Sequence, residues 1–259
     1  VFTTFFPDHL KYYGGSMERY FKDKAFIFKN QKAGNKLIAG EQAYSYIKEW
    51  GGKILSDMSV PPKKLPKGFK ISIPGEHNEY NATLALTTAR ILGIKDSIIK
   101  KALKSFKGVP GRLELIREVK GVKFYNDTTA TTPEATIAAL KALSNLETGR
   151  PNLKKNVILI MGGSDKGLDM TDLLLILEKH CKAVILLKGS GTDLIKPMIS
   201  KLKIFAGEFD NLKKAISSAR QLARRGDIVL LSPAFASFGM FKNEFDRGEQ
   251  FNKIVKATK

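Results

Sequence analysis

The sequence predicts an α/β protein whose C-terminal part is built around a mostly parallel sheet. From about residue 122 onward, short apolar runs alternate with segments whose apolar residues recur at helical spacing. The clearest such segment, residues 210–225, reads as an amphipathic helix that crosses between two strands. Several apolar runs end in loops rich in Gly, Ser, Ala or Thr. This alternation is typical of βαβ units, which place parallel strands side by side.

The elements are expected in the following order. The chain opens on the strand-like VFTTFF, and a strand at 69–73 precedes helices at 81–92 and 96–106. Residues 108–112, GVPGR, resemble an interdomain hinge, so we predict domains at 1–108 and 109–259. The first of these has too few strands for a core of its own. In the second, strands are expected at 122–125, 157–161, 183–187, 203–205 (weaker) and 227–231, and a helix begins at Pro133 behind a Thr132 cap.

Composition limits the functional classes. The chain has 259 residues, 43% of them hydrophobic, which suits a soluble globular protein. Its apolar runs are too short to span a membrane and no signal peptide is evident, so we expect no membrane partner and a cytoplasmic location. The formal charge of +19 comes from scattered, mostly lysine residues without a nucleic-acid-binding motif, so no nucleic-acid partner is expected. The lone Cys181 is expected to be a buried apolar residue.

Four loop segments contain chemistry-bearing residues. Residues 231–248, LSPAFASFGMFKNEFDRG, follow an apolar strand, and the hydroxyls of Ser232 and Ser237 could hold a carboxylate there. Residues 126–136, NDTTATTPEAT, lead into a helix N-terminus, which favours anions. Residues 161–167, MGGSDKG, place Lys166 beyond a strand, and residues 75–81, GEHNEYN, place two asparagines on one helical face. Taken singly, each segment also has an ordinary structural reading. Residues 231–248 could be a plain strand-to-helix connection, and residues 126–136 a capped helix start. Lys166 could be a solvated loop lysine, and the two asparagines could belong to a turn.

Together, in order and spacing, these segments resemble the Mur ligase family, in the branch that adds D-glutamate. The resemblance implies a Rossmann-like C-terminal domain that binds the amino acid, preceded by the incomplete tail of a central α/β ATPase domain. Thr129 stands where the family has a lysine, and the order of Glu244 and Phe245 is reversed relative to some members. The implied nucleotide contacts are Asn78, Asn81, Arg112 and Asp127, and the implied D-glutamate contacts are Thr131, Lys166, Ser237, Phe238 and Phe245.

The resemblance also implies a metal site near the N-terminus. Lys24 follows His9 at the family's spacing. In the family the histidine binds a second Mg²⁺ and the lysine is carbamylated, which turns a cation into an anion that supports the metal. The expected cofactors are therefore ATP and Mg²⁺. Read without the resemblance, Lys24 would be an ordinary surface lysine.

The implied reaction is ATP-dependent amide formation in peptidoglycan precursor synthesis. The carboxylate of UDP-N-acetylmuramoyl-L-alanine becomes an acyl phosphate, which the amine of D-glutamate attacks. No GxxxxGK[ST] phosphate loop occurs in the sequence, so this chain is expected to be inactive alone. Whether a missing N-terminal half must be supplied stays open, and a monomer is expected. The alternatives are a related amide ligase of the Mur or folylpolyglutamate type and a non-catalytic nucleotide-binding fragment.

Overall fold

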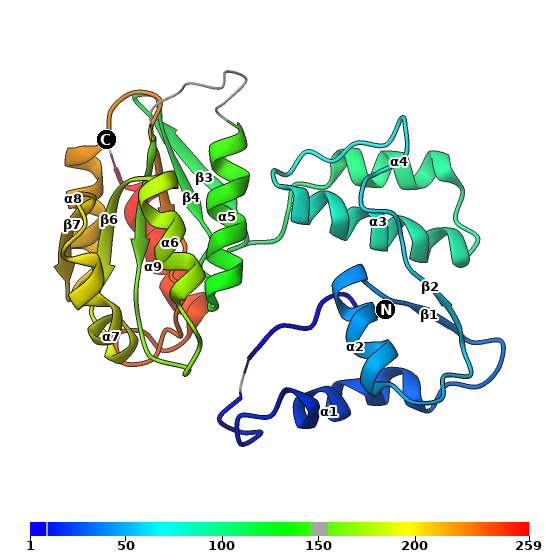
Figure 1. Cartoon of the computed structure of the whole chain (residues 1–259). Coiled ribbons are helices and arrows are strands. Elements are labelled where there is room, and N and C mark those ends of the chain that lie inside the picture. The colour runs from blue at the N-terminus through cyan, green and yellow to red at the C-terminus, as the bar shows by residue number, and fades with distance from the viewer. Residues whose placement is uncertain (9, 147–154, 259) are drawn as a thin grey trace. The chain divides into compact units, whose positions relative to one another are not determined.

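The computed structural model describes residues 1–8, 10–146 and 155–258. The chain divides into two compact units, Val1–Lys107 (unit 1) and Gly108–Lys259 (unit 2), which are coloured blue to cyan and green to red in Figure 1. Within the described residues, no helix is both long and apolar enough to cross a membrane.

Unit 1 combines a two-stranded parallel sheet with helices, and the expectation that it has too few strands for a core of its own is wrong, because aromatic side chains from its helices and first residues form one. Its core gathers Phe2, Phe5, Phe21 and Phe28, all at most 7% exposed, in edge-to-face and tilted ring contacts. Ser16 caps the first helix by accepting a hydrogen bond from the Arg19 amide at 3.2 Å. The elements are α1 (Met17–Lys29), β1 (Lys36–Ile38), α2 (Glu41–Trp50), β2 (Asp57–Ser59), α3 (Glu76–Ile91) and α4 (Asp96–Ser105).

Two strands predicted in unit 1 are wrong. In VFTTFF only Phe2 makes a β-bridge, to Ala39, and Phe2 and Phe5 pack into the aromatic core whereas Phe6 is exposed. Residues 69–73 form no strand. Phe69 packs instead in a small cluster with Leu86 and Ile99 between α3 and α4. The helix after it begins at Glu76, five residues before the predicted start.

Unit 2 holds a six-stranded sheet in the order β3-β4-β8-β5-β6-β7. Every pairing is parallel except that of the edge strand β3 with β4. This confirms the predicted α/β class with a mostly parallel sheet. The strands are β3 (Glu114–Val119), β4 (Val122–Asn126), β5 (Val157–Met161), β6 (Cys181–Leu187), β7 (Phe205–Phe209) and β8 (Ile228–Leu231).

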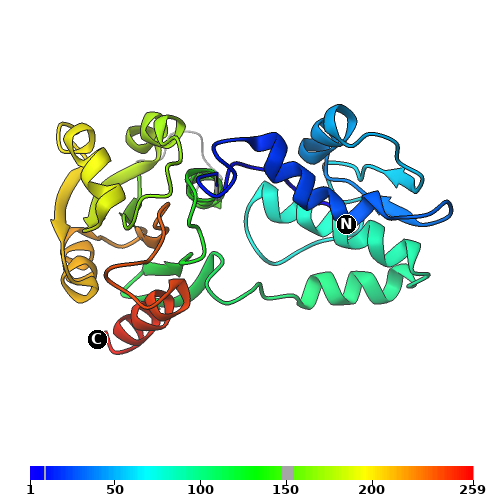
Figure 2. The same ribbon diagram turned by 90° about the horizontal axis from the view of Figure 1, so that it is seen from below.

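Helices cover both faces of this sheet. One layer packs α5, α6 and α7 on one face, and a second packs α8 and α9 on the other. Figure 2 shows the yellow-green α6 and the red α9 on opposite sides of the sheet. The helices are α5 (Pro133–Leu146), α6 (Thr171–His180), α7 (Ser190–Ile199), α8 (Leu212–Leu222) and α9 (Glu244–Lys256).

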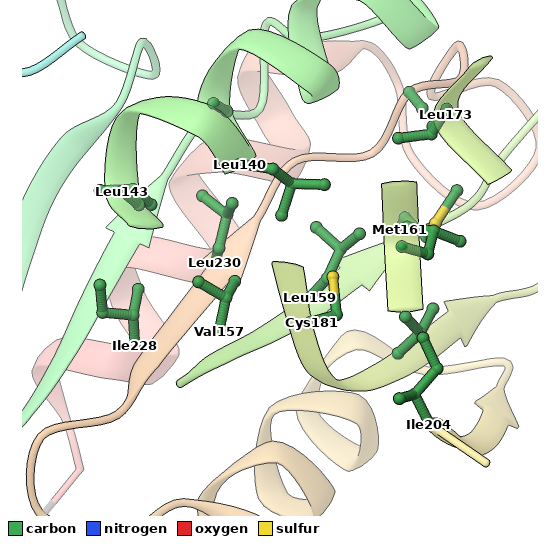
Figure 3. Packing of buried hydrophobic residues seen from close by; sticks show 14 of the residues in the cluster. Leu140, Leu143, Val157, Leu159, Met161, Leu173, Cys181, Ile204, Ile228 and Leu230 are labelled. Carbon is green, nitrogen blue, oxygen red and sulfur yellow. The ribbon is translucent and has the colours of Figure 1, made fainter. Parts of the chain in front are cut away.

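The central strands are wholly apolar because both of their faces are covered. In β5, Val157, Leu159 and Met161 point toward α5, α6 and α7, as Figure 3 shows, whereas Ile158 and Ile160 point to the other layer. All five are 0% exposed. Such runs are readable in a sequence, and four of the five strands predicted in this unit match closely. The fifth lies later than predicted, since β7 runs over Phe205–Phe209 and not over 203–205.

Cys181 lies in the same core (Figure 3), opposite Val157 in the sheet, and is 0% exposed. Burial raises the pKa of its thiol to about 12. Because the thiolate is the reactive form, we expect a disulfide reagent to label the native chain at least about 100-fold more slowly than the urea-unfolded chain. Colorimetric thiol titration measures both rates. Immediate labelling in native buffer would contradict this packing.

Candidate functional site

Three loops follow three adjacent strands of unit 2 at the carboxyl edge of the sheet. We call residues 127–132 the β4 loop, residues 162–170 the β5 loop and residues 232–243 the β8 loop. Strands β4 and β5 both pair in parallel with β8, which lies between them. All three loops therefore emerge at the same edge, where open α/β sheets bind their ligands.

Backbone hydrogen bonds tie the three loops together. The Ala234 amide donates to the Ala130 carbonyl at 2.9 Å and so links the β8 loop to the β4 loop. Ser164 and Ala236 exchange two hydrogen bonds of 2.9 and 3.2 Å and so link the β8 loop to the β5 loop. The Ser164 hydroxyl also donates to the Phe238 carbonyl. The β8 loop thus lies between the other two and is fixed to both.

These links bring predicted amino-acid contacts together. Lys166 Nζ donates to Thr131 Oγ1 at 3.4 Å, although the two residues stand 35 positions apart. Ser237 directly follows Ala236, the residue that pairs with Ser164, and it is 3% exposed. The Lys166 ammonium and the Thr131 hydroxyl, placed together in this way, can bind a carboxylate through charge-assisted hydrogen bonds.

The two predicted aromatic contacts are more exposed. Phe238 continues the β8 loop with 65% of its surface exposed, and Phe245 lies in the first turn of α9 with 61% exposed. Their roles in binding stay predictions.

Asp127 occupies a buried polar pocket at the end of β4. Its carboxylate accepts from the Leu113 amide at 3.0 Å and from the Ser232 hydroxyl at 2.8 Å. Ser232 Oγ also lies 3.0 Å from Thr136 Oγ1. Burial raises the pKa of Asp127 to about 7, against the lowering effect of these hydrogen bonds and of the Arg112 charge. The fold therefore brings the predicted nucleotide contacts Arg112 and Asp127 close together.

Sequence reasoning missed Arg247, which is 0% exposed in α9. Its guanidinium donates to Thr128 Oγ1 at 3.1 Å, to the Thr128 carbonyl at 2.8 Å and to the Phe235 carbonyl at 3.3 Å. Desolvation by burial lowers its pKa to about 10. No sequence signal marked it, because a charged residue in a polar helix ordinarily faces water.

The remaining candidates belong to unit 1. Asn78 and Asn81 both lie on α3, one turn apart, and Asn78 donates to the Pro74 carbonyl at 2.6 Å. Lys24 is exposed on α1, with its ammonium 5.4 Å from the centre of the Tyr20 ring. The carboxylate of Asp8 also affects Tyr20. The pKa of Tyr20 is raised mainly by burial and secondarily by the negative charge of Asp8. His9 lies outside the described residues.

The described part of the chain gives little support for a Mg²⁺ site. Residues 1–8, 10–146 and 155–258 contain no group of three or more His, Cys, Asp or Glu side chains that could hold a metal. Lys24 and His9 therefore stay predicted metal contacts, and no chemical step is assigned to the metal.

Unit 2 is thus an open α/β domain of the class that binds ligands at the carboxyl edge of its sheet. Residues 111–235 match the family model described as Mur ligase, glutamate ligase domain. The predicted family is thereby confirmed, and unit 2 contains a Mur ligase C-terminal domain.

Two curated relatives show which Mur ligases the chain is similar to. The chain is 33% identical over 98% of its length to UDP-N-acetylmuramoylalanine--D-glutamate ligase of Roseiflexus sp. (strain RS-1), covering 60% of that protein. It is 35% identical over 98% of its length to the enzyme of the same name from Borreliella afzelii (strain PKo), covering 58%. The chain thus spans about three fifths of the length of these curated relatives.

Solved structures share the fold at lower identity. MurF from Acinetobacter baumannii matches with a TM-score of 0.72 and 16% identity, over 98% of this chain and 58% of that one. E. coli FolC in complex with ADP matches with a TM-score of 0.65 and 18% identity, over 98% of this chain and 61% of that one. At such identities the likeness concerns the fold alone.

Proposed function

We propose that this chain is the amino-acid-binding part of a cytoplasmic ligase that adds D-glutamate to UDP-N-acetylmuramoyl-L-alanine in peptidoglycan precursor synthesis. The observation that carries the proposal is the convergence of the three loops, which joins Lys166 to Thr131 at 3.4 Å and fixes the β8 loop, with its buried Ser237, to both neighbouring loops. The relatives named for this reaction support the choice of amino acid.

In this proposal unit 2 positions the nucleophile. Lys166 pairs with the side-chain carboxylate of D-glutamate, and the hydroxyls of Thr131 and Ser237 complete its hydrogen bonds. The amine is then presented to an acyl phosphate formed from ATP and the UDP-linked substrate. Attack forms the amide bond and releases phosphate. The protein contributes by orienting the reactants and stabilising charge.

The proposed nucleotide contacts include residues of each unit. Asp127 and Arg112 belong to unit 2, and Asn78 and Asn81 belong to unit 1. We propose that unit 1 is the partial central domain and that Lys24, carbamylated, supports Mg²⁺ together with His9. The phosphate loop that would hold the ATP phosphates is absent from this sequence. We therefore expect turnover only when a segment with that loop is supplied. Without such a segment, we expect the chain to be a monomer.

Replacing Lys166 by Met tests the amino-acid site directly. The change removes a charge-assisted hydrogen bond, so we expect D-glutamate affinity to fall roughly 10- to 100-fold, or about 1.5–3 kcal/mol. Titration calorimetry with the whole chain measures it. Lys188→Met is the matched control, because Lys188 is exposed at the end of the neighbouring strand β6 and should leave affinity unchanged. Equal losses in both variants would point to general electrostatics instead of a site.

Turnover is tested by ATP-dependent phosphate release. The chain is combined with UDP-N-acetylmuramoyl-L-alanine and D-glutamate, with and without the N-terminal half of a homologous ligase. Release only with the added half supports the proposal. Absence of release with a folded, nucleotide-binding half would favour the non-catalytic fragment.

A related amide ligase of the folylpolyglutamate type is the second candidate, because FolC shares the fold. The amino acid that binds distinguishes this candidate from the first. L-Glutamate binding in preference to D-glutamate would favour it, whereas a preference for the D-enantiomer supports the first proposal.

A further inference from the structure

Arg247 is the largest of the fully buried side chains, and it contacts two of the three site loops. Through Thr128 it holds the β4 loop, and through the Phe235 carbonyl it holds the β8 loop. Thr128 lies three residues before Thr131, and Phe235 lies two residues before Ser237. The guanidinium therefore holds backbone close in sequence to two of the proposed D-glutamate contacts.

The packing around Arg247 leaves little freedom. Thr128 Oγ1 donates to the Glu244 carbonyl at 2.7 Å, and Asn126 Nδ2 donates to the Gly248 carbonyl at 3.2 Å. A Cβ atom on Gly248 would lie 2.6 Å from the Thr128 methyl carbon, so no larger residue fits there without a shift. The first turn of α9 is thus fixed closely against the β4 loop, and Arg247 extends this fixation to the β8 loop.

The charge of Arg247 is also unusual. Its three hydrogen-bond acceptors are two carbonyls and a hydroxyl, all neutral. Glu244 stabilises the cation only at longer range, and the side chain nevertheless stays protonated at neutral pH. Burying a cation without a directly bonded carboxylate is expensive, and a methionine or leucine would fill such a space at lower cost. A buried positive charge behind the loops lowers the energy of an anion bound in front of them.

We propose that Arg247 is a positioning residue that clamps the β4 and β8 loops around the amino acid and, through its buried charge, favours a substrate with an acidic side chain. This rests on the proposed function and adds to it a residue that does not touch the substrate.

The charge contribution is tested by affinity ratios. D-Glutamate and D-glutamine are titrated into the chain and into Arg247→Met and Arg247→Lys. A scaffold role lowers both affinities alike and leaves their ratio unchanged. The proposal expects the D-glutamate to D-glutamine ratio to fall about tenfold in Arg247→Met and to stay within about threefold of the original in Arg247→Lys. An unchanged ratio in Arg247→Met overturns the charge contribution.

The clamp is tested without ligand by hydrogen exchange. We expect Arg247→Met to speed exchange at least about tenfold in both 126–132 and 232–239, and Arg247→Lys, which loses the two-pronged contact, to do so partly. Arg225→Met, an exposed change in the same unit, is the control. Exchange that rises only in α9, or in neither loop, overturns the clamp. If the original chain binds neither amino acid, the proposed function fails, and this exchange pattern still decides the clamp.

Discussion

Replacing Asp127 by Asn is expected to stabilise unit 2 in a strongly pH-dependent way. The folded-state pKa of about 7 exceeds the ordinary value of 3.8. Between these values the folded chain keeps a proton that the unfolded chain releases, so the stability that this group contributes is complete below about pH 4 and is lost as the pH rises through 7. Asn cannot ionise. The variant should therefore match the original chain near pH 4 and exceed it by up to about 4 kcal/mol at pH 8.

Urea unfolding measures this difference, with Cys181 as the reporter. Because this thiol is buried in unit 2, pulse labelling with a dithiodipyridine reagent reports the unfolding of that unit. Asp210 is an exposed carboxylate in the same unit, so Asp210→Asn should show no comparable change in stability between pH 4 and pH 8. If Asp127→Asn changed stability equally at pH 4 and pH 8, the carboxyl would be ionised throughout, and the burial argument would be wrong.

Gly163→Ala should disrupt the site more than any other single methyl addition in the β5 loop. Gly163 has a φ of +147°, and a Cβ atom there would lie 2.2 Å from the Ala236 carbonyl oxygen. Relief of that clash must move the β8 loop away from Ser164. Backbone strain and overpacking together predict a loss of roughly 3–5 kcal/mol of stability and the loss of D-glutamate binding.

Gly226→Ala separates backbone strain from overpacking. Gly226 also has a positive φ, of +93°, but nothing lies within 4 Å of a Cβ placed there. It should therefore cost only the backbone strain, about 1 kcal/mol, and leave binding intact. Thiol pulse labelling and calorimetry compare the two variants. Similar losses in both would mean that the loops adapt to the methyl group, contrary to the close packing described.

The sheet of unit 2 was largely predictable from the sequence because its central strands are buried on both faces. β5 and β8 are uninterrupted apolar runs, and such runs stand out in a sequence. The edge strand β3 was missed because it mixes Glu114, Arg117 and Glu118 with apolar residues. β1 and β2 are only three residues each, too short for a periodic pattern to emerge.

The site was predictable only in part, for a different reason. Strand ends indicate which loops share an edge, so Lys166 and Thr131 could be expected near each other. No local sequence pattern indicates the bridge between Ser164 and Ala236, which links the β5 and β8 loops. Arg247 was hidden because its environment arises from packing, and a sequence gives only its charge.

The position of β8 affects how the protein is made. This strand comes last in the chain order of the sheet yet lies between β4 and β5. During synthesis, therefore, β4 and β5 have no shared neighbour until residues 228–231 have left the ribosome. Such non-local pairing delays folding of unit 2 until this strand has been made. A nascent chain interrupted before that point has neither the β8 loop nor the hydrogen bonds that link it to the β4 and β5 loops.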